Sequence, residues 1–376
     1  MTEYEKPDVI VVGAGVAGLG VAWRLAQRGV GVVVLERGVA ARGATWAAAG
    51  MLAPAAEIGF EELDLYTLGR ESLARWPAFA AEIEAETGLD VGLRTEGTLV
   101  AAEDRDSLVA LRRLFAFQQA QGAPVVWLTG EAAREREPLL SPRIPGAVWS
   151  PDDHQVDNRA LAAALAAAVR AAGGEIRTGV AVARIEPDAA SSAVVTEAGE
   201  RIAARAVVLA AGAWTRGLAG VEPAPVRPVK GQMLSLQTTD AVRPGVTVRG
   251  PRAYLVPKPD GRLVVGATSE ERGHDTAVTA GGLYRLLDGA IALVPGLEEL
   301  DVVETWAGLR PASRDHAPLL GRTAAPGVVA ATGHYRHGVL LAPVTADEVA
   351  AEVRALLAGS PETRPLLRPF SPLRFP

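Results

Sequence analysis

Residues 8–36 read DVIVVGAGVAGLGVAWRLAQRGVGVVVLE and predict a strand, a glycine-rich turn, a helix and a second strand. Val9–Val12 is a short apolar run rich in β-branched residues, which favours a strand buried on both faces of a parallel sheet. We expect the helix to end near Gly29 and the second strand to cover residues 32–35. This β-α-β unit constrains the fold more than any other segment of the chain.

Three glycines follow the first predicted strand at the spacing G-x-G-x-x-G: Gly13, Gly15 and Gly18. The first permits a tight turn, the second lets the backbone approach a pyrophosphate, and the third lets the helix lie close to the strand. Phosphates would then sit at a helix N-terminus, and Glu36 lies where a carboxylate can accept hydrogen bonds from a ribose diol. We interpret the segment as an adenine-dinucleotide site, with a purely structural turn as the alternative. It does not separate NAD from FAD.

Length and composition restrict the class of protein. The chain has 376 residues, of which 49% are hydrophobic and 22% charged, which is enough for two domains with a large core. A formal net charge of −6 gives no reason to expect nucleic acid or an anionic membrane as a partner. The absence of cysteine excludes disulfides, thiolate metal sites and iron–sulfur clusters. The acidic N-terminus does not resemble a signal peptide, so we expect a cytoplasmic protein without a metal site or a membrane span.

The rest of the chain alternates predicted helices and strands. Helices are expected over residues 61–87, 104–121, 158–172 and 281–294, and a last one from about Gly338 to Leu357. Strands are expected over residues 98–101, 124–128, 180–185, 193–197, 206–210 and 302–306. Between residues 226 and 266 the pattern changes to short alternating strands, and the turn Pro259-Asp260-Gly261 predicts an antiparallel hairpin. That change marks a second domain.

The candidate functional side chains are two arginines and a tyrosine. The sequence contains no G-x-S-x-G elbow, H-E-x-x-H pair or P-loop, and its five histidines do not form a ligand cluster. Arg310 ends the strand-like run ETWAGLR, Arg336 lies in GHYRHGV just before the last helix, and Tyr254 begins the hairpin. Together, guanidinium and phenol groups could hold the carboxylate of an amino acid. Taken singly, each is more often a surface side chain, and the sequence does not show that they converge.

Several stretches carry a resemblance to a known family. They are VIVVGAGVAGLGVAWRLAQRG, VVVLER, ATWAAAGMLAPAAE, VDNRALAAAL, VVLAAGAW, PVKGQML, YLVPKPDGRLVVGATSE, WAGLRPASRDHAPLLG and GHYRHGVLLAP. Through these stretches almost the whole chain resembles the FAD-dependent D-amino acid oxidase superfamily, and within it the glycine oxidases of bacterial thiazole (thiamin) biosynthesis. The first stretch is shared by many dinucleotide proteins, and the later ones are more specific.

The resemblance implies an α/β fold class with a Rossmann-like FAD-binding domain, built on a parallel sheet with helices. A second, α+β domain would bind the substrate on a mostly antiparallel sheet. The FAD-binding domain would be discontinuous, with residues 1–90, 145–222 and 305–376, and the substrate-binding domain would contain residues 91–144 and 223–304. The cofactor would be non-covalent FAD, held by Gly13, Gly15, Val16, Ala17, Gly18, Glu36, Arg37, Thr45, Ala47, Ala48, Gly50, Met51, Val180, Ala211, Gly212, Trp214, His334, Arg336, His337, Gly338 and Leu340. Trp46 and His337 depart from the residues expected in relatives.

The implied reaction is oxidative deamination of glycine and other small amines, such as sarcosine and small D-amino acids. Hydride would pass from Cα to flavin N5, and O₂ would reoxidise the flavin and form hydrogen peroxide. Arg310 would pair with the substrate carboxylate, Tyr254 would support it and Arg336 would lie close by. A helix beginning near Gly338 could stabilise the reduced ring through its dipole.

The resemblance also implies a homo-oligomer, a tetramer or a dimer, and a thiazole-forming enzyme as partner for the imine product. The nearest alternative is a sarcosine or D-amino acid oxidase or dehydrogenase of the same superfamily. An NAD-dependent dehydrogenase and a non-catalytic dinucleotide-binding module are alternatives of other classes.

Overall fold

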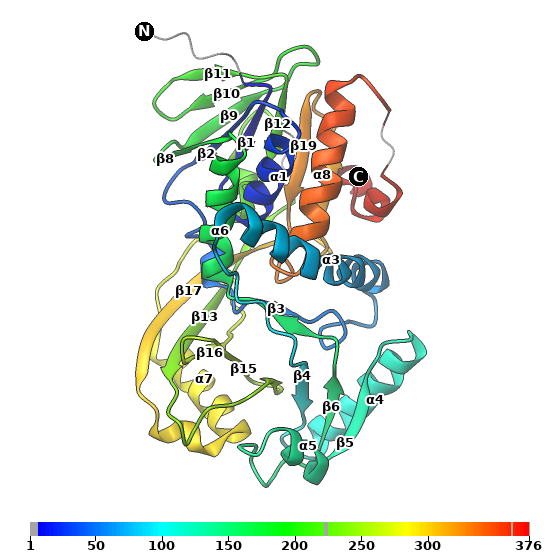
Figure 1. Ribbon diagram of the computed structural model, residues 1–376, viewed down its shortest axis with the longest axis vertical. Coiled ribbons are helices and arrows are strands. Elements are labelled where there is room, and N and C mark those ends of the chain that lie inside the picture. The colour runs from blue at the N-terminus through cyan, green and yellow to red at the C-terminus, as the bar shows by residue number, and fades with distance from the viewer. Residues whose placement is uncertain (1–6, 222–224, 362–363, 376) are drawn as a thin grey trace.

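A computed structural model describes residues 7–221, 225–361 and 364–375. Figure 1 shows two main sheets that follow each other along the long axis of the molecule, with the glycine-rich segment in the upper one. The α/β fold class predicted from the sequence is confirmed, with a parallel sheet in one half and a mostly antiparallel sheet in the other.

The upper sheet has six strands in the order β18-β19-β12-β1-β2-β8. All neighbours pair in parallel except β18 and β19, which are antiparallel. The predicted β-α-β unit is present as β1 (Val9–Val12), α1 (Val16–Ala26) and β2 (Val32–Glu36). The other strands are β8 (Glu175–Thr178), β12 (Ala206–Leu209), β18 (Leu319–Arg322) and β19 (Val328–Thr332).

Both faces of this sheet are covered, which explains why β1 is apolar at every position. Val9 and Val11 belong to a core shared with the helices α1, α3 (Leu63–Thr87), α6 (Asn158–Ala171) and α8 (Ala342–Leu357). Ile10 and Val12 face the opposite way and pack under a small antiparallel sheet of β9 (Val182–Glu186), β10 (Ala193–Thr196) and β11 (Arg201–Ala203). Alternate residues of one strand therefore serve two cores.

The lower sheet has eight strands in the order β17-β13-β16-β15-β14-β4-β6-β5. Only the pair of β14 and β4 is parallel among its described strands. The strands are β4 (Thr98–Ala101), β5 (Val126–Thr129), β6 (Gly146–Ser150), β13 (Arg227–Gln237), β14 (Thr247–Arg249), β15 (Tyr254–Pro257), β16 (Arg262–Gly266) and β17 (Val302–Ala312). The predicted hairpin is β15 and β16.

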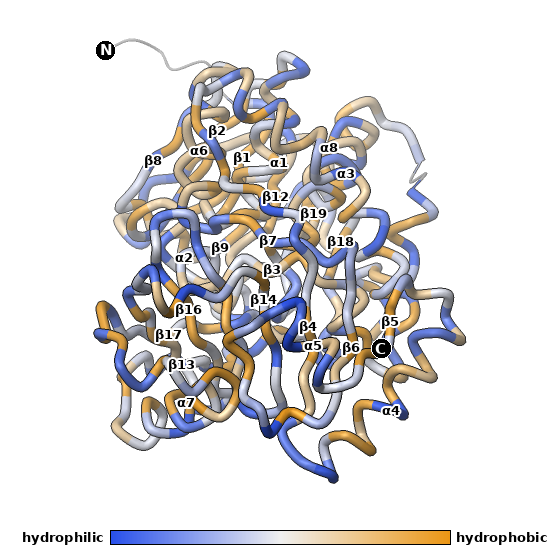
Figure 2. The backbone as a smooth tube through the Cα atoms, turned by 60° about the horizontal axis from the view of Figure 1, so that its bottom comes forward, coloured by the Kyte–Doolittle hydropathy of each residue, from blue (hydrophilic) through white to orange (hydrophobic). Residues whose placement is uncertain are grey.

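Three helices accompany the lower sheet: α4 (Arg105–Ala120), α5 (Gly130–Arg136) and α7 (Ala280–Leu293). Hydrophobic and hydrophilic segments alternate along α4 at the edge of the molecule (Figure 2), as expected for a helix with one face in water. Between the two sheets lie the short α2 (Ala44–Ala47) and the two-stranded pair of β3 (Met51–Leu52) and β7 (His154–Gln155).

Short 3-10 turns complete the described chain at η1 (Gly212–Gly217), η2 (Pro295–Glu299), η3 (Pro365–Phe370) and η4 (Pro372–Arg374). Within the described ranges, no helix is long and apolar enough to cross a membrane.

Strand β17 is longer than its predicted range, because Pro311 does not end it. The carbonyl oxygen of Pro311 accepts a hydrogen bond from Tyr335 N at 2.7 Å, so the C=O of Pro311 points away from β13. A proline at such a position removes no hydrogen bond of the ladder. It pairs with Pro228 of β13, which also lacks an N–H. Arg310 therefore lies inside a strand and not at its end.

The last helix begins four residues later than predicted, at Ala342 and not at Gly338. Residues 338–341 form a turn in which Leu341 N donates to the carbonyl oxygen of His337 at 2.9 Å. Pro343 stands in the first turn of the helix, where its missing N–H costs nothing. The expectation that a helix N-terminus lies at Gly338 is therefore wrong.

The sequence patterns also do not predict β6, β8, β18, β19 or α5, all of which are short. The domain division stays a proposal. Strands β6 and β17 belong to the eight-stranded sheet, although the proposed boundaries at 144/145 and 304/305 lie before β6 and within β17. The proposed boundary at 222/223 lies outside the described residues.

Asp157 is expected to stabilise the start of α6, because its Oδ1 accepts hydrogen bonds from Arg159 N at 2.8 Å and Ala160 N at 3.0 Å. Its Oδ2 also accepts from Arg262 Nη2 at 2.8 Å. Loss of the cap in Asp157→Ala should cost about 1 to 2 kcal/mol, visible as a lower apparent Tm. Asp157→Asn keeps a capping oxygen and should cost less. Equal losses in the two variants would contradict this role for the cap.

Candidate active site

A cavity of about 680 Å³ lies where the two main sheets meet. One end is lined by Gly13 and Glu36 of the six-stranded sheet, and the other by Tyr254 and Arg310 of the eight-stranded sheet. The turn at residues 334–339 contributes His334, Tyr335, Arg336, Gly338 and Val339 to the wall. The structure thus brings the far end of the chain onto the glycine-rich turn near its beginning.

The three glycines of the turn meet three different steric demands. Gly13 has a φ of +106°, and a Cβ there would lie 2.5 Å from the carbonyl oxygen of Ala210. A Cβ on Gly18 would lie 2.0 Å from the carbonyl oxygen of Gly13, so helix and strand could not pack. A Cβ on Gly15 would meet only Thr45 Oγ1, at 3.5 Å, and would otherwise project into the cavity. The missing side chain of Gly15 leaves room for a ligand beside the backbone.

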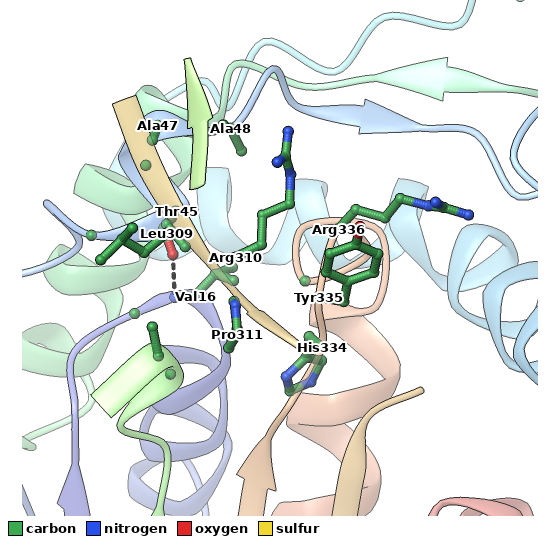
Figure 3. A pocket seen from close by; sticks show the side chains of 18 of the residues that line it. Val16, Thr45, Ala47, Ala48, Leu309, Arg310, Pro311, His334, Tyr335 and Arg336 are labelled. Atoms are coloured by element: carbon green, nitrogen blue, oxygen red, sulfur yellow. Dashed lines mark hydrogen bonds between the residues drawn. The ribbon is translucent and has the colours of Figure 1, made fainter. Parts of the chain in front are cut away.

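The N-terminus of α1 opens toward this cavity. Its N-cap is Gly15, which provides no capping side chain, and its first turn carries no acidic residue. Val16 N donates to Thr45 Oγ1 at 3.0 Å (Figure 3), and Ala14 N donates to Glu36 Oε2 at 2.9 Å. The helix dipole and the backbone N–H groups of the first turn make such a terminus favourable for phosphate.

An aromatic stack lies at the Glu36 end of the cavity. The guanidinium of Arg37 lies 4.0 Å from the ring centroid of Trp214. Trp214 in turn stacks on His274, with ring centroids 5.5 Å apart, and His274 Nε2 lies 3.3 Å from the carbonyl oxygen of Ala213. Val180 also lines this end. The stack ties the loop before α7 to the six-stranded half.

At the other end, Arg310 rises from β17 into the cavity (Figure 3). Its Nη1 donates to the carbonyl oxygen of Thr268 at 3.1 Å and approaches that of Lys230 at 3.5 Å. The guanidinium lies flat over Gly231, where a Cβ would come within 2.5 Å of Nη1. Among the described residues, no carboxylate lies within ion-pair distance of Arg310. Its charge is therefore available to an anion.

Tyr254 lies beside Arg310 at the start of β15. Its ring covers Gly266, its neighbour across the hairpin, and its hydroxyl lies 3.9 Å from Met233 Sδ. Burial raises the pKa of Tyr254, and this effect exceeds the opposite effect of the Arg310 charge. The phenol therefore stays protonated and can donate a hydrogen bond to a carboxylate.

The third predicted residue, Arg336, has other partners. Its side chain extends away from Arg310 (Figure 3), and its Nη2 lies 3.5 Å from both the carbonyl oxygen of Glu57 and Glu62 Oε2. Its Nε lies 3.9 Å from Glu57 Oε2. Arg336 lines the cavity, but it is engaged by carboxylates.

Glu57 and Arg249, which the sequence analysis does not single out, form an ion pair in the cavity wall. Burial alone would raise the pKa of Glu57, but the charge of Arg249, with contributions from His337 and Arg336, outweighs it and holds the pKa at about 2. Glu57 is therefore a carboxylate at any ordinary pH and a weak base. No local motif marks this pair, because its members are far apart in the sequence.

Three predicted cofactor residues do not line the cavity, whereas the others do. Gly18 packs under Gly13, as described above. His337 is buried with Nδ1 3.5 Å from Glu57 Oε2, and burial lowers its pKa to about 4. The carbonyl oxygen of Leu340 accepts hydrogen bonds from two residues of α3, Ser72 and Trp76, at 2.7 and 3.0 Å.

The cavity also has lining residues that were not predicted. They include Arg42, Glu57, Gly231, Met233, Arg249, Arg252, Ala267, Thr268, Gly308, Leu309 and Tyr335. All of these except Arg42, Arg249 and Arg252 lie in stretches that carry the resemblance, so they could have been found from the sequence.

Comparison with known proteins gives consistent matches along the chain. The bifunctional protein ThiO/ThiG of Nostoc sp. (strain PCC 7120) is 37% identical over 91% of this chain, which spans 52% of that protein. The crystal structure of iminodiacetate oxidase from Chelativorans sp. BNC1 matches with a TM-score of 0.85 at 28% identity, covering 97% of this chain and 98% of that one.

Glycine oxidase of Geobacillus kaustophilus (strain HTA426) is 38% identical over 97% of this chain and 96% of its own length. A crystal structure of glycine oxidase from Geobacillus kaustophilus matches with a TM-score of 0.90 and covers 99% of both chains. The family model described as FAD dependent oxidoreductase matches residues 8–352, and the chain therefore belongs to the family of FAD-dependent oxidoreductases.

Proposed function

We propose that this protein is a glycine oxidase, which oxidises glycine and other small amines with O₂ in a reaction that depends on FAD. One observation carries the proposal: a single continuous cavity joins the glycine-rich turn at Gly13 to Arg310, the group that we propose binds the carboxylate. The similarity to glycine oxidase over nearly the full length of both chains supports the same conclusion.

The cavity fits the cofactor at its phosphate-binding turn. The open N-terminus of α1 and the space left by Gly15 would hold a pyrophosphate, and Glu36 would bind the ribose. Thr45, Ala47, Ala48, Gly50 and Met51 would lie along the ring system together with His334 and Gly338. Bound FAD would supply the two-electron oxidation of the amine and pass those electrons to O₂.

For glycine the balanced reaction consumes one O₂ and one water and yields glyoxylate, ammonia and hydrogen peroxide. The protein has to hold the substrate in one orientation, and Arg310 and Tyr254 can do so through the carboxylate. Thr268 and Lys230 fix the guanidinium through their backbone oxygens, so its orientation is set before substrate binds.

Apolar packing around this end favours a small substrate. Met233, Met51 and Tyr254 belong to one cluster of packed side chains, which also contains Ala47 and Ala267. In the proposed site these residues would exclude water from the reacting carbon and favour a substrate with a short side chain. Because the Cα hydrogen would leave as a hydride, the site needs no strong base to remove a proton from Cα. His334 is consistent with this, since burial lowers its pKa to about 4 and keeps it neutral.

A thiazole-forming enzyme is the partner we propose for the imine product. The ThiO/ThiG relative supports this proposal, because it joins a part similar to this chain to a second part within one protein. In such a fusion the product of one active site is made close to the next.

Anaerobic mixing with a panel of small amines tests the function directly. We expect purified protein to be yellow, its flavin absorbance to bleach with glycine, sarcosine or D-alanine, and peroxide to form once air is admitted. A colourless protein, or a yellow one that no amine bleaches, would favour a non-catalytic dinucleotide-binding module.

Arg310→Ala should lower kcat/KM for glycine by about 100-fold or more, because a desolvated carboxylate loses a bidentate charged partner. Arg310→Lys keeps the charge without the paired N–H groups and should recover only part of the loss. The matched control is Arg314→Ala, which removes an exposed arginine that does not line the cavity. Steady-state kinetics normalised to bound FAD checks this, and full activity in Arg310→Ala would overturn the assignment.

Tyr254→Phe should lower kcat/KM for glycine by roughly tenfold, because a hydrogen bond to a charged group is lost while the packing of the ring is kept. Since burial raises the pKa of Tyr254, the phenol stays a donor at neutral and mildly basic pH. The loss should therefore be the same at pH 7 and pH 9. A loss that disappears between these values would contradict the raised pKa of Tyr254.

Deuterium at Cα of glycine should slow flavin reduction in anaerobic rapid mixing, as a primary isotope effect on cleavage of the C–H bond. Unlabelled glycine reacted in D₂O is the control for solvent effects, because hydrogens on nitrogen and oxygen exchange with the solvent. Equal reduction rates for both Cα isotopologues would mean that C–H cleavage is not the slow step.

A further inference from the structure

The cavity wall beside the substrate end contains a second arginine that is already neutralised. Arg249 is the cross-strand neighbour of Tyr254 in the pair of β14 and β15. Its Nη1 is bound by Glu57, and the two side chains are 25% and 10% exposed. Both residues line the cavity that also contains Arg310. Two guanidinium groups therefore lie in one wall, and only one of them has a carboxylate partner from the protein.

Tyr254 connects the two arginines electrostatically. After burial, which raises the pKa of Tyr254, the charges that act on its hydroxyl are those of Arg310 and Arg249, which lower the pKa, and of Glu57, which raises it. These groups are thus within interaction distance of one phenol. A ligand held by Arg310 and Tyr254 would have Arg249 nearby, because Arg249 lies opposite Tyr254 in the strand pair and lines the same cavity.

We propose that Arg249 is a latent binding site for a second carboxylate, and that Glu57 closes this site by occupying the guanidinium and by repelling other anions. The site then favours amines with one carboxylate over amines with two. This inference rests on the proposed function, because it concerns the substrates of the same cavity. A protein of the same fold, the iminodiacetate oxidase of Chelativorans, carries the name of a dicarboxylate amine.

Two substituted glycines test the inference, because they differ only in the group on nitrogen. Sarcosine carries a methyl group, and iminodiacetate carries a carboxymethyl group. Oxidation of iminodiacetate with one O₂ and one water gives glyoxylate, glycine and hydrogen peroxide. Initial rates are needed, because the glycine formed is itself a substrate.

The measurement is the ratio of kcat/KM for iminodiacetate to kcat/KM for sarcosine. In Glu57→Gln this ratio should rise by about tenfold or more, since the repelling charge is gone and the guanidinium of Arg249 is released. The gain should vanish in the double variant Glu57→Gln/Arg249→Gln. An unchanged ratio in Glu57→Gln, or a gain that persists in the double variant, would overturn the proposal.

Glu61→Gln is the matched control, because it removes the same charge from an exposed residue four positions away. Glu61 does not line the cavity, so the ratio should not change. A rise as large as in Glu57→Gln would mean that net charge alone is responsible, which would also overturn the proposal.

Glu57→Gln could fail to fold, since it leaves a partly buried arginine without its partner. Arg249→Gln then tests the same point, because an unpaired Glu57 should lower the ratio below that of the unaltered protein. An unchanged ratio in Arg249→Gln would contradict the role of Arg249. If the unaltered protein oxidises neither glycine nor sarcosine, the proposed function fails. If it oxidises both and no variant changes the ratio, only the second carboxylate site fails.

Discussion

A buried lysine side chain, Lys258, links the two halves of the molecule. Lys258 follows β15 and is 2% exposed, and its Nζ donates to the carbonyl oxygens of Ala49 at 2.6 Å and Val156 at 2.8 Å. Burial lowers the pKa of Lys258 to about 7, so a lysine is tolerated there only because it has these acceptors. The acceptors belong to the cavity loop after α2 and to the approach to α6. The hairpin that carries Tyr254 is therefore fixed against the cofactor side of the cavity.

The arginines of the cavity differ in what surrounds them. Arg310 is oriented by the backbone oxygens of Thr268 and Lys230, which carry no net charge. Arg249 is paired with the carboxylate of Glu57. A guanidinium held only by dipoles keeps its attraction for an anion, whereas one held by a carboxylate loses most of it. Of these two arginines, Arg310 thus keeps the stronger attraction for a carboxylate.

The local parts of the fold could be predicted from the sequence. The turn at Gly13, the cap of α6 by Asp157 and the hairpin at Tyr254 each depend on residues within one short segment. The start of the last helix could not be located, because the turn before Ala342 has helix-like hydrogen bonding and similar composition. The extension of β17 through Pro311 depends on a partner strand, which the local sequence does not contain.

The same difference between local and long-range contacts decided which site residues could be recognised from the sequence. Arg310 and Tyr254 could be proposed because the stretches around them resemble a known family. Glu57 also lies in such a stretch, but its pairing with Arg249 could not be proposed, because the two residues are 192 positions apart and meet only in the folded chain. Their pairing also decides which arginine is available, so the sequence alone could not assign different roles to Arg249 and Arg310.

The cavity is built from segments near the beginning, the middle and the end of the chain. A ligand that fills it would touch both sheets at once, and its binding free energy would add to the free energy with which the two halves dock. The fraction of the protein that holds the cofactor would therefore affect how cooperatively the two halves unfold. The more tightly the dinucleotide is bound, the more nearly the two sheets would melt as one unit.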